Sequence, residues 1–268
     1  MRRNFAQALK TGGLDIKEEY DKLYNLFYGQ DKDGKSLSQC ISDNFLDFHF
    51  RGTCLTLEEF DRKHEFNFEE SPRNFDTDYF VSFCEYVWNF VTFLQDGYFF
   101  RYHNKMFFWQ HIEKLIDAIG YERTQENGFT IFVPKDNVAI AVSESPLIPD
   151  DVSYKVIAYH HHSMKGDLEA KKETIRKLAD LLEPKRENLK NENKKLANDL
   201  FGMFNKMNIR HNNCDPSDES KYCKYIAEMS SKDLETWYDE IFQMCLLAFM
   251  ELDHVERKAK INELKSHF

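Results

Sequence analysis

Glycine and proline are scarce in this sequence. There are 10 glycines and 6 prolines in 268 residues, whereas a turn-rich all-β fold needs such residues at most of its chain reversals. The scarcity therefore predicts a mainly α-helical fold. Hydrophobic residues make up 42% and charged residues 31% of the chain, a balance that excludes collagen-like and largely disordered chains. A globular chain of this length forms one or two domains.

Apolar residues recur at three- and four-residue intervals through much of the first 120 residues, as they do on one face of a helix. This spacing predicts helices over 14–28, 75–94 and 106–119. Gly120 follows the third helix in the position of a C′ cap. The segment 37–75 has no clear period, and we expect short helices or loops there. The 24 phenylalanines of the chain predict an aromatic-rich core.

The hydrophobic period then changes to about two. Three short runs follow, at 121–125, 129–133 and 138–143. They are separated by Asn127-Gly128 and by residues 134–137, both of which favour turns. The pattern predicts a small three-stranded antiparallel β-meander. We place a domain boundary after it, so that residues 1–145 form a helical domain that ends in the meander.

Beyond this boundary the helical period returns, and residues 146–268 are expected to form a C-terminal helical bundle. The predicted helices are 150–164, 167–183, 188–207, a short one that begins at Asp215-Pro216, and a long one from 231 to 254. Asp215 with Pro216 has the sequence of an N-cap followed by proline at the first helical position. Ser230 with Asp233 resembles a capping box at the start of the long helix.

The net charge of the chain is −10, which disfavours a protein that coats nucleic acid non-specifically. Residues 41–100 hold 12 Asp or Glu against 4 Lys or Arg, whereas residues 163–208 hold 11 Lys or Arg against 8 Asp or Glu. The second segment suits a polyanion, and a solvated helix face is the alternative. The six cysteines have no regular spacing and indicate neither a zinc knuckle nor a disulfide framework. Without an apolar segment of membrane-spanning length, we expect a cytoplasmic protein that makes no membrane contact.

Two motifs invite a metal-binding interpretation. Asp31-Lys-Asp-Gly34 places glycine fourth rather than sixth, as an EF-hand would require, so a charged surface turn is the better interpretation. His160, His161 and His162 are consecutive, and on a helix their side chains would diverge by about 100° per residue. Their role stays open between a metal site and a polar helix end, and we expect no metal and no cofactor. The usual motifs of hydrolases, phosphate-binding loops and zincins are missing from the sequence.

The segment from Asn208 to Asn213 offers the clearest chemistry. Arg210 supplies a planar cation that can bind a phosphate, and His211 can exchange a proton near neutral pH. Together they suit metal-independent RNA cleavage. The residues expected to bind substrate beside them are Asn212, Asn213 and Lys206. The alternative is that Arg210 and His211 brace a helix junction through backbone carbonyls.

A helical hairpin followed by Ile209-Arg-His211 and by Gln243-Met-Cys-Leu-Leu-Ala-Phe249 resembles the HEPN domain. With the junction from Gly120 to Ser143, the arrangement over about residues 110–255 is similar to bacterial abortive-infection proteins. The resemblance implies an RNA-binding protein or a metal-independent ribonuclease of stress, toxin or phage-defence systems, acting as a homodimer. It also implies that Arg210 binds the phosphate and His211 transfers the proton. The usual motif separates the two by several residues, so adjacent residues need a non-helical backbone or a second subunit.

A second interpretation belongs to a different functional class. The acidic, Phe-rich domain over residues 1–145 would hold a protein partner, and the chain would be a non-catalytic helical interaction module. A cluster of exposed aromatic residues between 44 and 75 would favour this interpretation, because monomers rarely leave such patches uncovered. Whether the chain is an enzyme is therefore left open by the sequence.

Overall fold

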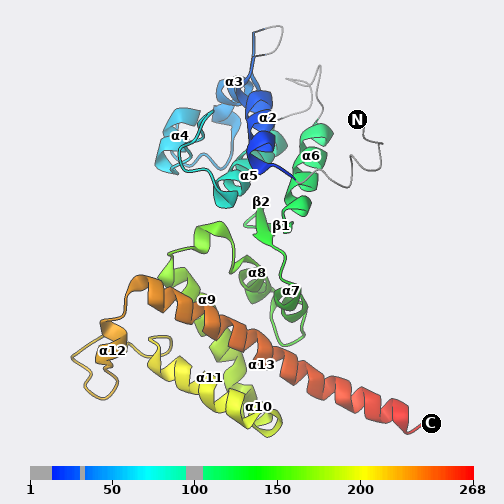
Figure 1. Cartoon of the computed structure of the whole chain (residues 1–268), viewed down its shortest axis with the longest axis vertical. Helices are drawn as coiled ribbons and strands as arrows, with labels where there is room; N and C mark the ends of the chain where they lie inside the picture. Colours follow the sequence, from blue (N-terminus) through cyan, green and yellow to red (C-terminus); the bar gives the residue numbers. More distant parts are fainter. Residues whose placement is uncertain (1–13, 31–33, 95–104) are drawn as a thin grey trace, which may run out of the picture. The chain divides into compact units, whose positions relative to one another are not determined.

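The computed structural model describes residues 14–30, 34–94 and 105–268, so most of the turn at Asp31-Lys-Asp-Gly34 lies outside the described residues. The described part is mainly helical, with one two-stranded sheet (Figure 1). The chain divides into two compact units, Met1–Phe132 and Val133–Phe268, which we call the N-terminal and C-terminal units. Among the described helices, none has an apolar stretch that would cross a bilayer.

The N-terminal unit contains short helices around a long apolar one, followed by a β-hairpin. Its elements are α2 (Ile16–Tyr28), α3 (Leu37–Asp43), η1 (Phe45–Asp47), α4 (Leu57–Lys63), α5 (Thr77–Phe93), α6 (Lys105–Ala118), β1 (Tyr121–Glu126) and β2 (Phe129–Pro134). The three helices predicted from the apolar spacing, the short helices between 37 and 75 and the first two strands are confirmed. Gly120 has the positive φ of 78° that a C′ glycine adopts.

Helix α5 is the centre of this unit, because its side chains are buried around most of its circumference. Asp76 caps its N-terminus by accepting a hydrogen bond from the Tyr79 amide at 2.9 Å. Strand β2 is attached to α5 by side chains. The Asn89 amide group exchanges two hydrogen bonds with the backbone of Thr130, at 2.8 and 2.9 Å. The α5 helix therefore fixes the position of the hairpin in the N-terminal unit.

The third strand predicted over 138–143 is wrong. Residues Asn137–Ser143 form helix α7, whose first turn is capped by the Asp136 carboxylate, which accepts from the amides of Val138 and Ala139 at 2.9 and 3.0 Å. A short apolar run is compatible with a buried helix as well as with a strand. Here the N-cap formed by Asp136 favours the helix. Ala139 and Val142 belong to the core of the C-terminal unit, so the division between the units falls at Phe132/Val133 and not after residue 145.

The C-terminal unit is a set of helices. They are α7, α8 (Asp150–Ala158), η2 (His162–Met164), α9 (Leu168–Leu182), η3 (Glu183–Lys185), α10 (Arg186–Glu192), α11 (Lys194–Lys206), α12 (Lys224–Ala227) and α13 (Ser231–Lys265). The single helix expected over 188–207 is two helices, because Asn193 adopts φ −142° and caps α11 through the Leu196 amide. The helix expected from Asp215-Pro216 is also wrong. The Asp215 carboxylate accepts from the Ser217 amide and hydroxyl in a local turn, and α12 begins at Lys224.

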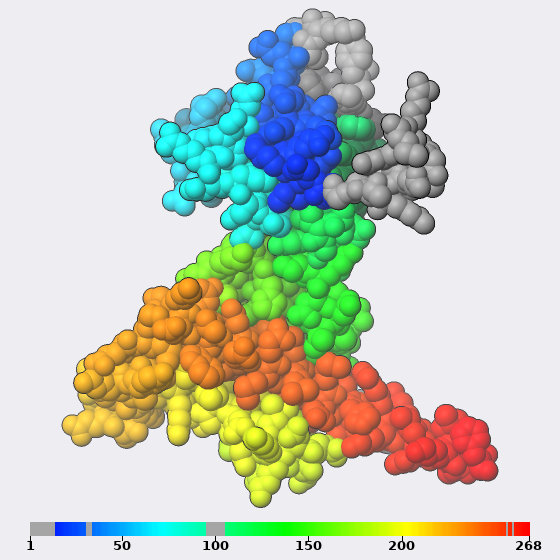
Figure 2. Space-filling model, viewed as in Figure 1, coloured from blue at the N-terminus to red at the C-terminus, as the bar shows by residue number. Residues whose placement is uncertain are grey.

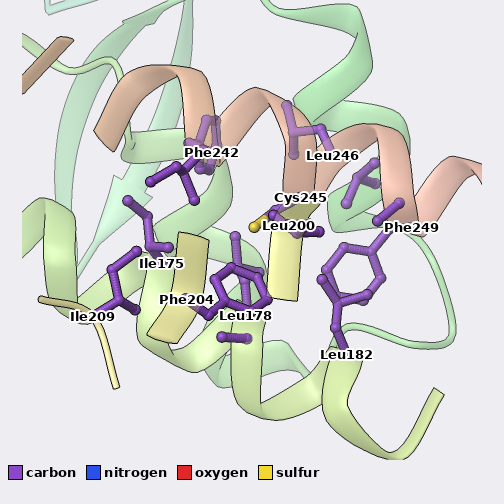
Figure 3. Packing of buried hydrophobic residues seen from close by; sticks show 14 of the residues in the cluster. Ile175, Leu178, Leu182, Leu200, Phe204, Ile209, Phe242, Cys245, Leu246 and Phe249 are labelled. Carbon is purple, nitrogen blue, oxygen red and sulfur yellow. The ribbon is translucent and has the colours of Figure 1, made fainter. Parts of the chain in front are cut away.

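The core of the C-terminal unit lies between α9, α11 and α13. Figure 3 shows Leu178 and Leu182 from α9, Leu200 from α11, and Cys245 and Phe249 from α13 converging on one another, and all five are buried. The expectation that 167–207 and 231–254 pack together is thereby confirmed. Ser230 is the N-cap of α13: its hydroxyl accepts from the Asp233 amide at 3.1 Å and donates to the Asp233 carboxylate at 2.7 Å.

Helix α13 is longer than the sequence pattern predicts. Among the side chains of α13 whose burial is described, Leu252 is the last buried one, and Lys258 still forms an ion pair with Glu192 of α10. The helix then continues to Lys265 with exposed side chains (red in Figure 2).

Candidate functional site

The loop after α11 places the residues that the sequence singled out. Asn208 has the left-handed φ of 57° that often ends a helix, and the Arg210 amide donates to the Phe204 carbonyl at 3.1 Å. The Ile209 side chain is buried in the core of the C-terminal unit. The backbone at Arg210 and His211 is therefore non-helical, and the two side chains are not held at helical angles to each other.

Arg210 is bound to the C-terminal end of α9. One terminal nitrogen, Nη2, donates to the Ala179 carbonyl at 2.7 Å, and the other, Nη1, pairs with the Glu183 carboxylate. The guanidinium also lies over the rings of Phe204 and Phe201, 5.3 and 5.7 Å from their centroids. The side chain is 16% exposed. This is the geometry of a brace between two helices, the alternative that the residue types left open.

Asn213 is a second internal brace. Its side-chain oxygen accepts from the Asn208 amide at 3.0 Å, and its side-chain nitrogen donates to the Lys221 carbonyl at 2.7 Å. Its own carbonyl accepts from the Cys223 amide at 2.8 Å. The residue is 3% exposed, so the amide holds the loop from 208 to 223 together and is turned away from solvent.

The other three predicted site residues are nearer the surface. His211 is half-buried, whereas Asn212 and Lys206 are exposed. The Asn212 side chain accepts from the Cys214 amide at 3.3 Å. Within the described residues, no hydrogen bond or ion pair joins the ring of His211 to Arg210. The five candidates share one loop and the end of one helix, but Arg210 and Asn213 are committed to structural contacts.

The three consecutive histidines lie after α8, where the helix has ended. The His160 ring is perpendicular to that of Phe242 on α13, with centroids 5.5 Å apart, and burial lowers the pKa of His160. His161 caps η2, because its Nδ1 accepts from the Ser163 amide at 3.2 Å. His160 therefore packs on α13, His161 caps a local turn, and the choice between a metal site and a polar helix end for these histidines stays a prediction.

A different site stands out in the N-terminal unit, and we call it the aromatic pocket. It has a volume of about 410 Å³ and is lined by Phe48, Phe50, Phe60, His64, Phe66, Glu85, Tyr86, Asn89, Phe90, Phe129, Thr130 and Ile131. Several of the rings meet edge to face, as Phe60 and Phe90 do at 84° with centroids 5.9 Å apart. A neighbouring hollow of about 740 Å³ shares Phe48, Phe50 and Phe129 with the pocket.

The apolar surface around this pocket is open to solvent. Phe50 is 57% exposed and Leu46 is 61% exposed, and both line the hollow next to the pocket. Both lie in the segment between 44 and 75, where an exposed aromatic cluster would favour an interaction module, but Phe50 is the one exposed phenylalanine of that segment. The spacing of the sequence does not single them out, because the walls of the pocket come from four separate stretches of chain.

The polar side chains of the aromatic pocket form hydrogen bonds that hold its walls together. The Glu85 carboxylate accepts from the Phe132 amide at 2.6 Å, and Asn89 is bonded to Thr130. Behind the pocket, burial raises the pKa of Asp61 to about 6, although the Tyr86 hydroxyl donates to both carboxylate oxygens at 3.1 and 3.2 Å. The pocket therefore offers a mainly apolar cavity in an acidic unit.

Comparison with known proteins adds no relative. No protein-family model matches the chain, and neither a curated protein nor a solved structure matches it. The HEPN resemblance accordingly stays a prediction.

Proposed function

We propose that this chain is an interaction module whose N-terminal unit binds a protein partner through the aromatic pocket. The observation that carries the proposal is the aromatic pocket itself, a cavity of about 410 Å³ with mainly aromatic walls, beside the exposed Phe50 and Leu46. Large apolar side chains that remain open to water mark binding surfaces more often than catalytic ones. A cavity of this size suits a large apolar side chain of the partner as an anchor.

The charge of the surrounding chain indicates what should flank that anchor. Residues 41–100 hold 12 Asp or Glu against 4 Lys or Arg, and Asp47 and Glu85 line the two hollows. A basic neighbour would be steered to this surface, and an acidic one would be repelled. The partner that fits is a peptide segment with an aromatic or branched aliphatic residue next to Lys or Arg.

The chemistry of the lining favours binding over catalysis. Glu85 and Asn89 are hydrogen-bonded to the backbone of β2, and the His64 ring packs against Phe60 with centroids 4.4 Å apart. The Tyr86 hydroxyl donates to the Asp61 carboxylate, but burial raises the pKa of Tyr86 well above the neutral range, so this hydroxyl keeps its proton and is a poor nucleophile. The pocket is thus suited to hold a side chain.

The test is a peptide-display selection on the full chain, followed by fluorescence polarisation on the selected peptides. We expect the enriched peptides to share an apolar anchor flanked by Lys or Arg, with affinities that weaken as salt rises. Phe50→Ala should weaken binding at least tenfold, because hot-spot aromatic residues carry most of such an interface. Leu55→Ala is the matched control, since Leu55 is 65% exposed and lies outside both hollows. Failure to enrich any such peptide, or equal binding by Phe50→Ala, would refute the proposal.

RNA binding or metal-independent cleavage by a HEPN-like C-terminal unit, in bacterial stress or phage defence, is the second candidate function. It is supported by the half-buried His211 and the exposed Lys206 and Asn212 in one loop. If the chain acts in this way, Arg210 braces the loop and does not bind the phosphate. His211 then transfers the proton together with residues of a second copy of the chain. The assay is cleavage of a mixed single-stranded RNA pool in EDTA, with His211→Ala as the variant. A wild type that neither binds nor cleaves the pool removes this candidate.

A further inference from the structure

A polar pocket in the C-terminal unit plays no part in either proposal above. It has a volume of about 350 Å³, which falls at the small end of the range for small-molecule sites. It lies where the segment after α8 and the first turn of α9 meet α13. The residues on which the argument rests are Tyr159, Lys165, Lys171, Lys232, Glu235 and Asp239.

The ammonium group of Lys171 is buried and held in place by two carboxylates. Its side chain is 5% exposed, and Nζ lies 2.8 Å from Glu235 and 2.7 Å from Asp239. The two acids are four residues apart on α13, so they present both carboxylates on one face of the helix. Glu235 is itself fixed by the Gly166 amide, which donates to it at 2.8 Å. An ammonium group has three N–H donors, and these two contacts use two of them.

Tyr159 adds a second buried donor, whose hydroxyl lies beside the Asp239 carboxylate. The residue is fully buried, its ring is stacked on Phe242 with centroids 3.8 Å apart, and its hydroxyl makes no hydrogen bond of good geometry within the described residues. Burial raises the pKa of Tyr159 far above the neutral range, so the hydroxyl keeps its proton. A buried hydroxyl without a well-formed hydrogen bond costs free energy, and a ligand or an ordered water that accepts from it would remove that cost.

We propose that this pocket binds a small ligand through an oxyanion, either a phosphate or a carboxylate, which accepts hydrogen bonds from Tyr159 and Lys171. Both donors line the same cavity. Lys165 and Lys232 also line it, so three lysines face two carboxylates and the pocket is positive overall. Buried ion pairs contribute little to the stability of a fold. We therefore assign the pairs with Glu235 and Asp239 the role of holding the Lys171 ammonium group in position. This site is independent of the protein-binding function proposed for the N-terminal unit.

The test measures binding of two simple probes to the full chain. Inorganic phosphate and acetate are titrated by calorimetry at constant ionic strength, with sodium chloride as the reference salt. We expect saturable binding of one ion per chain, and the tighter of the two probes identifies the oxyanion of the ligand. Heats that match the sodium chloride reference for both probes would overturn the proposal.

Three variants assign that binding to the pocket. Tyr159→Phe removes the hydroxyl and keeps the ring stacked on Phe242, so it should fold as the wild type does and raise the Kd about tenfold. Lys232→Ala changes an exposed side chain of the pocket and should raise the Kd severalfold. Lys224→Ala is the control, since Lys224 is 73% exposed, pairs with Glu228 and lies outside the pocket. Equal affinity of the wild type, Tyr159→Phe and Lys232→Ala would overturn the assignment, even if the wild type binds phosphate.

Discussion

Replacement of Arg210 by alanine tests whether this residue is a structural brace or a phosphate-binding group. The variant loses the charged hydrogen bond to the buried Ala179 carbonyl, worth about 1.5–3 kcal/mol. It also loses the ion pair with the half-exposed Glu183, about 0.2–1 kcal/mol, and contact with two phenylalanine rings, about 0.5–1 kcal/mol each. One change works in the opposite direction. Arg210 Nε is buried and has no hydrogen-bond partner among the described residues, so its removal should stabilise the variant by about 1 kcal/mol. The net expectation is a destabilisation of about 2–5 kcal/mol.

The assay is urea unfolding followed by circular dichroism, with thermal melting alongside. For a chain of this size the loss corresponds to a fall in Tm of about 4–20 °C. Lys206→Ala is the matched control, because Lys206 is exposed in the same part of the chain and its removal should change stability by less than about 0.5 kcal/mol. A double-mutant cycle with Glu183→Ala should give a coupling of about 0.5–1 kcal/mol.

The same Arg210→Ala variant is then assayed against the single-stranded RNA pool. A brace predicts that any loss of RNA activity follows the loss of folded protein. An Arg210→Ala variant that melts as the wild type does, yet has lost RNA cleavage, would refute the brace and restore the assignment of Arg210 as a catalytic residue.

Three further predictions concern Asp61, Lys171 and Asn193. The folded chain holds the Asp61 proton up to about pH 6, whereas an ordinary Asp loses it near 3.8, so the free energy of unfolding falls as pH rises between these values. Asp61→Asn should remove this fall and stabilise the protein at pH 7.5 by about 1–2 kcal/mol, a value reduced for the partial exposure of Asp61. Urea unfolding of the wild type and the variant at pH 4.5 and 7.5 measures the difference. Lys171→Ala should destabilise the protein by about 3 kcal/mol, because it removes the only ammonium shared by Glu235 and Asp239 among the described contacts. Thermal melting measures this loss, and an unchanged Tm would contradict the prediction. Asn193→Ala should cost about 1 kcal/mol as a lost N-cap of α11, which guanidinium unfolding can resolve.

The sequence predicted the long helices well, because each has an apolar stripe that only a helix buries. Leu178 and Leu182, for example, are four residues apart on α9 and both face the core. The same reasoning failed where a run was short. The residues from Val138 to Ser143 satisfy a strand pattern, and the Asp136 cap that makes them a helix is a single local contact. The split at Asn193 is also a capping effect, which a stripe of apolar residues does not reveal.

The sites were harder to predict, since their residues come together only in the folded chain. Phe50 and Phe129 pack with ring centroids 4.4 Å apart although 79 positions separate them in sequence. Lys171 and Glu235 each look like an ordinary charge on a solvated helix face, and only the packing of α9 on α13 buries the ammonium. For Arg210 the residue type was informative, but whether it meets a phosphate or the Ala179 carbonyl depends on where α9 ends.

Helix α13 is continuous, but only its first part packs against the core of the C-terminal unit. It runs for 35 residues, about 50 Å, while the last of its described side chains to be buried is Leu252. Up to that point, exchange of an amide proton with solvent requires opening of the core. From Lys258 to Lys265 the helix depends mainly on its own hydrogen bonds, which hold an isolated segment only marginally in water. Deuterium should therefore enter the last two turns long before it enters the turns around Cys245, and a single secondary-structure element will report both a fraying end and the global unfolding of its unit.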